Sequence, residues 1–114
     1  MRARTPFRCV DIASAEVLLA RRDLVLLDAR DAGSFEQSHI DGAQHLSSAN
    51  LSAVLSDTAR ARPILIYCYH GNASREYAQI FSDFAFSEVY SLDGGYEAWP
   101  KGAPAGEISS ASAP

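Results

Sequence analysis

The stretch LIYCYHGNAS, residues 65–74, places a cysteine where an apolar segment ends and a helical pattern begins. The uninterrupted apolar run before Cys68 predicts a strand that is buried on both faces. A short loop with Gly71 and Asn72 follows, and apolar residues repeat at helical spacing from Ser74 onward. Strand, loop and helix in this order are typical of α/β folds, in which ligands bind at the carboxyl ends of the strands.

Strands and helices alternate along the rest of the chain. We expect strands at residues 7–10, 24–30, 63–68 and 87–92, and helices at 15–22 after an N-cap at Ser14, within 48–59, from Ser74 to Phe84, and for one turn at 96–99. This order predicts an α/β domain over residues 1–100, with a central parallel sheet of about five strands and helices on both faces. Residues 101–114 are small, polar and rich in proline, which predicts a disordered tail.

Composition excludes several classes of function. The net charge of −4 argues against a nucleic-acid binder, which normally carries a basic face. No apolar run reaches the 18 residues of a membrane span, and no apolar segment follows the basic N-terminal residues as in a secretory signal. Cys9 and Cys68 form neither a disulfide framework nor a Cys-x-x-Cys pair. We therefore expect a cytoplasmic protein that binds neither nucleic acid nor membranes.

The position of Cys68 favours a reactive thiolate. Loop amides and the N-terminus of the following helix stabilise an anion, and cysteine pKa values fall from about 8.5 to roughly 3.5–7.5 in such surroundings. Gly71 and Asn72 readily adopt the turns that point successive N–H groups inward. The alternative is a buried, unreactive strand cysteine, a common state for free cysteines.

Two basic residues beside Cys68 extend the hypothesis. Arg75 falls in the first helical turn, where a cation is disfavoured by about 0.3–1 kcal/mol, and this suggests a substrate anion nearby. A solvated arginine that points away from the site is an equal alternative. His70 is a candidate second positive or proton-donating group, or a loop residue that faces water.

Other chemistries fit the sequence less well. Cysteine-dependent phosphatases carry an arginine six positions after the cysteine, whereas here Ser74 stands at that position and Arg75 follows it. A cysteine protease needs a histidine base, and nothing in their spacing selects His39 or His45. The three histidines and two cysteines show no metal-ligand spacing, so we expect no metal and no cofactor.

Three motifs in order give the chain a family resemblance. CYHGNAS (68–74), LLDARDAGSFEQSHIDGA (26–43) and SLDGGYEAW (91–99) resemble the motifs of the rhodanese family, single-domain thiosulfate sulfurtransferases. The resemblance spans roughly residues 7 to 100. One departure is Ser38, where the family usually has glycine, and a serine costs little there unless φ must be positive.

The resemblance implies sulfur transfer through a persulfide. Cys68 would be the nucleophile that takes the outer sulfur of thiosulfate or of another sulfane-sulfur donor. It would pass that sulfur to cyanide, a small thiol or a thioredoxin-like protein. Arg75 would attract the donor. The cradle for the persulfide would be formed by the amides of Tyr69, His70, Gly71, Asn72, Ala73 and Ser74.

Two alternatives to this function remain open. The first is a sulfur-relay protein whose donor is the persulfide of another protein. The second is a non-catalytic binding module of the same family, and the presence of Cys68 counts against it. Residues near the other motifs receive structural interpretations. We expect an ion pair between Asp28 and Arg30, core packing for Trp99, and a purely turn-forming role for Gly94 and Gly95.

Overall fold

Two strands inside the sheet are fully buried, and their mainly apolar sequences explain this burial. Every residue of β2 (Val25–Asp28) and β4 (Ile64–Tyr67) is buried, as expected for strands covered on both faces. The two strands pair in parallel, with Val25 opposite Ile64 and Asp28 opposite Tyr67. Both strands thus end at the same edge of the sheet.

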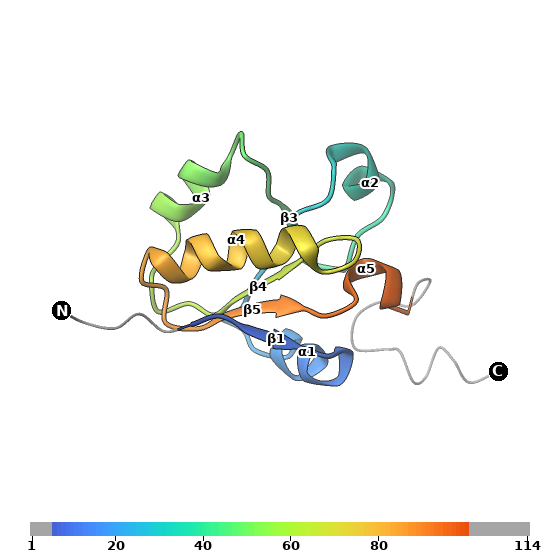
Figure 1. Cartoon of the computed structure of the whole chain (residues 1–114), viewed down its shortest axis with the longest axis horizontal. Coiled ribbons are helices and arrows are strands. Elements are labelled where there is room, and N and C mark those ends of the chain that lie inside the picture. The colour runs from blue at the N-terminus through green and yellow to red at the C-terminus, as the bar shows by residue number, and fades with distance from the viewer. Residues whose placement is uncertain (1–5, 101–114) are drawn as a thin grey trace.

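A computed structural model describes residues 6–100 and shows one five-stranded parallel sheet, in the order β1-β5-β4-β2-β3 (Figure 1). The edge strands are β1 (Arg8–Val10) and β3 (Gln44–His45), and β5 (Val89–Leu92) lies between β1 and β4. The helices are α1 (Ile12–Leu19), α2 (Ala32–Gln37), α3 (Leu51–Asp57), α4 (Asn72–Asp83) and α5 (Gly95–Ala98). The predicted α/β class with a central parallel sheet is therefore confirmed.

Each face of the sheet carries its own hydrophobic core. Figure 1 shows α3 and α4 on one face and α1 on the other. The first core contains Val25, Leu27, Ile64, Ile66 and Val89, with Leu55 of α3 and Ala78 and Phe81 of α4. The second contains Leu26, Leu65, Tyr67 and Leu92, with Ala15 and Leu18 of α1 and Trp99. Alternate strand residues thus face opposite cores, as the pleat of a strand requires.

Two helix starts differ from the sequence prediction. Asp11, not Ser14, is the N-cap of α1: its carboxylate accepts a hydrogen bond from the Ser14 N–H at 2.9 Å. The prediction of Ser14 as N-cap is wrong, because Ser14 contributes the amide that is capped. The capping side chain belongs to Asp11, three residues earlier. Helix α4 begins at Asn72, two residues before Ser74, and this places Ser74 inside its first turn.

Two short elements have no counterpart in the sequence prediction. α2 has six residues, none of them buried, and β3 has two residues. Elements this short show no hydrophobic period that a sequence pattern can detect. The residue after α2, Ser38, has φ −169°, a value that any residue adopts, so a serine causes no strain there.

The predicted disordered tail at residues 101–114 lies outside the described residues, and so do residues 1–5. Of the five helices described, α4 is the longest at 12 residues, and none has the length and apolar character needed to cross a membrane.

Candidate active site

Cys68 follows the last residue of β4, at the carboxyl edge of the sheet. Its side chain is 4% exposed, and by alternation from Ile64 and Ile66 it belongs to the face covered by α4. The residue borders a pocket of about 360 Å³ that is lined by Ala29, Arg30, Asp31, Cys68, Tyr69, His70, Asn72 and Ala73. The predicted strand–loop–helix junction thus opens onto a cavity large enough for a small ligand.

The sulfur of Cys68 accepts hydrogen bonds from the loop that follows it. The Gly71 amide donates to Sγ at 3.1 Å and the Ser74 amide at 3.3 Å. Gly71 is the N-cap of α4 and has φ +108°, a conformation that favours glycine, but it has no side chain to cap the helix. Sγ therefore binds the Ser74 amide that a capping side chain would otherwise bind. This arrangement suits a thiolate, because helix N-termini favour anions.

Opposing effects set the pKa of Cys68. Burial alone would raise it, but hydrogen bonds from the side chain and amide of Ser74, and from the amides of Gly71 and His70, outweigh burial and lower the pKa below its ordinary value. The sequence prediction of a stabilised thiolate agrees with this geometry. The amide donors include three of the six residues proposed as a cradle.

A second buried hydroxyl stands behind Ser74. Ser74 Oγ lies 3.6 Å from Cys68 Sγ and 2.7 Å from Ser91 Oγ of β5, and both serines are fully buried. Ser91 escaped the sequence analysis because a serine inside an apolar strand carries no signal of its own. The register supplies the signal, since Ser91 pairs with Ile66 and so shares its face of the sheet with Cys68.

Helix α5 holds the backbone of the site. The amides of Tyr96 and Glu97 donate to the carbonyls of Cys68 and Tyr69, at 2.7 and 3.0 Å. A Cβ atom at Gly95 would stand 2.4 Å from both carbonyl oxygens, so only glycine allows this approach. The expectation that Gly95 serves the turn alone is therefore wrong: its backbone also packs against the loop of Cys68.

The expected ion pair of Asp28 and Arg30 is present and buried. Arg30 Nη2 lies 2.7 Å from Asp28 Oδ2, and the side chains are 4% and 0% exposed. The Arg30 guanidinium also donates to the Ser38 carbonyl at 2.6 Å and lies 4.0 Å from the centre of the Tyr96 ring. Arg30 thus joins the structural pair to the wall of the Cys68 pocket. Trp99 packs in the second core, as expected.

Asp31 is a pocket residue that the sequence analysis missed. Its carboxylate is the N-cap of α2 and accepts a hydrogen bond from the Ser34 amide at 3.0 Å. It also accepts one from the Tyr69 hydroxyl at 2.9 Å, and that hydroxyl contacts Ser34 Oγ as well. The hydrogen bonds from Ser34 and Tyr69 lower the pKa of Asp31 to about 2. A charged carboxylate therefore stands at the mouth of the pocket.

The basic residues proposed for the site have acidic partners. His70 Nδ1 lies 3.1 Å from Glu97 Oε1, and Arg75 Nη2 lies 3.3 Å from Asp93 Oδ1. His70 lines the pocket together with Asn72 and Ala73, whereas Arg75 points to Asp93 and is not a lining residue. The proposed attraction of the donor by Arg75 stays a prediction.

The other histidines are bound elsewhere. His39 Nδ1 lies 2.7 Å from the Phe35 carbonyl oxygen, and His45 Nε2 lies 2.6 Å from that of Arg30. Neither histidine lines the Cys68 pocket, so neither of these two is placed as the base of a cysteine-protease pair with Cys68.

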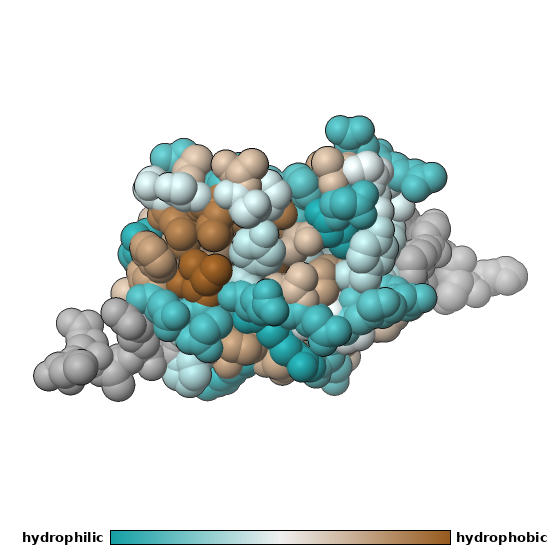
Figure 2. Space-filling view, turned by 45° about the horizontal axis from the view of Figure 1, so that its top comes forward, coloured by the Kyte–Doolittle hydropathy of each residue, from teal (hydrophilic) through white to brown (hydrophobic). Residues whose placement is uncertain are grey.

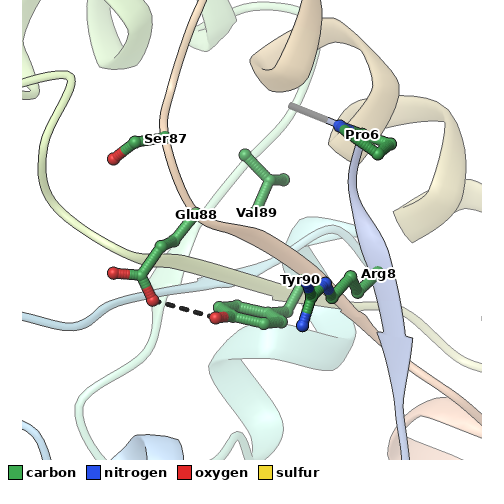
Figure 3. A pocket seen from close by; sticks show the side chains of 6 residues that line it. All are labelled: Pro6, Arg8, Ser87, Glu88, Val89 and Tyr90. Carbon is green, nitrogen blue, oxygen red and sulfur yellow. Dashed lines mark hydrogen bonds between the residues drawn. The ribbon is translucent and has the colours of Figure 1, made fainter. Parts of the chain in front are cut away.

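Two further hollows lie away from Cys68. Figure 2 shows apolar side chains gathered on the surface where Leu51 and Leu55 of α3 face Ile80 and Phe84 near the end of α4. A pocket of about 130 Å³ lies beside the start of β5 (Figure 3), where the Tyr90 hydroxyl donates to Glu88 at 2.9 Å. Arg21 also binds Glu88, at 2.8 Å, so this second hollow holds an internal polar network.

Solved structures with the same fold come from several organisms. A protein from Anabaena sp. is 22% identical with a TM-score of 0.71, and the match covers 79% of this chain and 74% of that one. A Rhodopseudomonas palustris protein of unknown function, described as a possible tyrosine phosphatase, is 21% identical with a TM-score of 0.69 (82% and 79% covered). The match to Bacillus anthracis CoADR-RHD, in its reduced form, covers 80% of this chain and 16% of that chain, at 19% identity and a TM-score of 0.69.

The family model for the rhodanese-like domain matches residues 12–101. This range contains the strand, loop and helix around Cys68, the ion pair of Asp28 and Arg30, and the α5 segment that binds the loop. The match covers more than half of the chain, and the fold of the described residues agrees with it. The chain therefore belongs to the rhodanese-like domain family.

Proposed function

We propose that this chain is a sulfurtransferase that carries sulfane sulfur as a persulfide on Cys68. The observation that carries the proposal is the pair of amides, from Gly71 and Ser74, that bind a buried sulfur at the edge of an open pocket. A thiolate that is stabilised and accessible from one side is the form of cysteine that acts as a nucleophile.

The first half-reaction loads the cysteine. With thiosulfate as donor, the Cys68 thiolate attacks the outer sulfur, a new S–S bond forms, and the bond to the SO₃ group breaks. Sulfite leaves with the electron pair, and the persulfide keeps one negative charge. The loop amides of residues 69–74 are the donors proposed to hold that charge where the outer sulfur lies.

The second half-reaction releases the sulfur. A thiophilic acceptor such as cyanide, a small thiol or a protein thiol attacks the outer sulfur of the persulfide. The S–S bond breaks, and Cys68 leaves as the thiolate that began the cycle. Because the same hydrogen bonds stabilise this leaving thiolate, they support both halves of the reaction.

Intact-mass spectrometry of the reduced protein tests the proposal. After incubation with thiosulfate we expect a mass increase of one sulfur atom, and after cyanide its loss together with the release of thiocyanate. Cys68→Ser should show no increase, whereas Cys9→Ser should load normally, because Cys9 lies on the exposed edge strand β1. Loading of Cys68→Ser would place the nucleophile elsewhere.

Two outcomes would favour the other functions. If thiosulfate fails but the persulfide of a second protein loads Cys68, the chain is a sulfur-relay protein. If no donor adds sulfur to a fully reduced protein, the reading as a non-catalytic binding module replaces the proposal.

A further inference from the structure

The basic groups around Cys68 are balanced by carboxylates. Three basic side chains line the pocket or stand on its loop within residues 6–100. Each lies within salt-bridge distance of an acidic partner: Arg30 with Asp28, His70 with Glu97, and Arg75 with Asp93. These pairs leave little net positive charge among the described residues to attract a doubly charged donor.

Asp31 adds a negative charge, and none of the salt bridges within residues 6–100 balances it. Its carboxylate lines the pocket, and its hydrogen bonds come from the neutral groups of Ser34 and Tyr69. Its low pKa keeps it charged throughout the pH range of any ordinary assay. A ligand that approaches Cys68 through this pocket therefore meets a carboxylate.

The amides that favour anions are directed at the sulfur. Gly71 and Ser74 donate to Sγ at 3.1 and 3.3 Å, so their effect is strongest for the thiolate and for the transferred sulfur. The remainder of a donor extends away from them into the pocket, toward Arg30, Asp31 and Tyr69. Thiosulfate carries two negative charges, shared by its outer sulfur and its three oxygens, and the leaving sulfite would carry both of them in that space.

We propose that Asp31 makes the Cys68 pocket selective for donors that bring at most one negative charge, such as the persulfide of a small or protein thiol, over the thiosulfate dianion. This inference rests on the proposed function, and it assigns the class of donor that the same cysteine accepts best. Thiosulfate remains usable at a lower kcat/KM.

The chemistry balances for a persulfide donor R–S–SH. The Cys68 thiolate attacks the outer sulfur, and the bond between the two donor sulfurs breaks. R–S leaves as a thiolate with the electron pair, and the transferred sulfur keeps its proton. One negative charge is present before and after the step, so no oxidant or reductant is required.

Two small donors isolate the effect of charge. Thiosulfate and the methanethiosulfonate anion present the same outer sulfur, but a methyl group replaces one charged oxygen in the second. The second-order rate constant for loading Cys68 is measured with each donor by quenching and intact-mass spectrometry. Asp31→Asn removes the charge and keeps an N-cap oxygen for α2. Asp57→Asn makes the same charge change at the exposed C-terminal end of α3. The chain after α3 enters the sheet at the edge opposite Cys68.

The ratio of the two rate constants decides the outcome. We expect Asp31→Asn to raise the ratio of thiosulfate to methanethiosulfonate at least threefold, and Asp57→Asn to leave it unchanged. An unchanged ratio in Asp31→Asn, or an equal rise in both variants, overturns the selectivity while Cys68 loading still upholds the proposed function. Failure of both donors to load the native protein overturns the proposed function itself. If Asp31→Asn does not fold, Asp31→Ser, which also caps helices, gives the same decisive ratio.

Discussion

Ser74 Oγ lies 2.7 Å from Ser91 Oγ, and this contact joins the helix of the active-site loop to the neighbouring strand through two fully buried hydroxyls. Ser74 also contacts the Cys68 sulfur at 3.6 Å. When Cys68 is a thiolate, the Ser74 hydroxyl must donate to it, and its oxygen is then free to accept from Ser91. Such a chain strengthens each of its hydrogen bonds by polarisation.

Removal of the Ser91 hydroxyl should therefore raise the pKa of Cys68. We expect Ser91→Ala to move the midpoint of iodoacetamide alkylation to higher pH by a few tenths of a unit, since a neutral hydrogen bond contributes about 0.5–1.5 kcal/mol and only part of it reaches the sulfur. Ser74→Ala should shift the midpoint further, because it also removes the direct donor. The rate at each pH is measured after full reduction.

Two variants separate positioning from a general loss of packing. Ser91→Thr keeps the hydroxyl and should restore the native midpoint. Ser82→Ala deletes another buried hydroxyl, near the far end of α4, and should lower stability without moving the midpoint. Equal midpoints for Ser91→Ala and the native chain would show that Ser74 acts on the sulfur without any contribution from Ser91.

Gly95 should tolerate no side chain. An added Cβ would stand 2.4 Å from the carbonyl oxygens of Cys68 and Tyr69, and φ there is +61°. We expect Gly95→Ala to lower the free energy of unfolding by about 2–5 kcal/mol, the sum of the costs of a left-handed backbone and of an overpacked contact. Sulfur transfer should fall as well, because one of the displaced carbonyls belongs to Cys68, the proposed nucleophile. Urea unfolding and thiocyanate release measure the two effects.

Gly42 provides the matched control for this substitution. Its φ is +87°, but a Cβ there would meet nothing within 4 Å. Gly42→Ala should therefore show only the backbone cost of about 1–2 kcal/mol, with sulfur transfer intact. If both variants lose stability equally and keep activity, close packing of α5 against the loop is not required.

The buried ion pair gives a prediction about stability. Arg30→Met leaves the Asp28 carboxylate buried without its partner and should cost about 3–5 kcal/mol in unfolding free energy. The double variant Asp28→Leu with Arg30→Met should recover much of that loss, because no unpaired charge remains. Arg75→Met breaks an exposed pair and should change stability little, which makes it a suitable control. A double variant no more stable than Arg30→Met would contradict this account.

The sequence predicts the elements whose burial leaves a pattern. β2, β4 and α4 are long enough, or apolar enough, for their period to be visible, and the Gly71–Asn72 turn marks the loop between the last two. Cys68 could be found from this junction because loop amides and a helix N-terminus act locally. The candidate nucleophile and the amides proposed as its cradle are therefore predictable from neighbours in the sequence.

The surroundings of Cys68 are less predictable, because they depend on contacts between distant segments. The carboxylate of Asp31 accepts a hydrogen bond from the hydroxyl of Tyr69, and the hydroxyl of Ser91 contacts that of Ser74 from the neighbouring strand. Gly95 resembles a turn glycine until the loop carbonyls are placed against it. A local pattern carries no information about any of these approaches, which exist only once the strands are in register.

The last prediction concerns phosphate esters, the substrates of cysteine-dependent phosphatases. The amides of Gly71 and Ser74 both lie within 3.3 Å of Sγ, so the loop closes around a single sulfur atom. A phosphoryl group needs a wider ring and a guanidinium that binds two of its oxygens. Arg75 is instead paired with Asp93. We therefore expect no appreciable hydrolysis of p-nitrophenyl phosphate by the reduced native chain.

A variant with a longer loop tests the geometric reason. Insertion of one glycine after Asn72, combined with Ala73→Arg, places an arginine six positions after Cys68 and widens the ring. We expect this variant to transfer sulfur more slowly and to bind arsenate or phosphate more tightly than the native chain does, as measured by protection of Cys68 from alkylation. Native turnover of p-nitrophenyl phosphate that disappears in Cys68→Ser would show that the loop already accommodates a phosphoryl group. Phosphate-ester hydrolysis would then replace sulfur transfer as the proposed function, because a loop that admits a phosphoryl group is not closed around one sulfur atom.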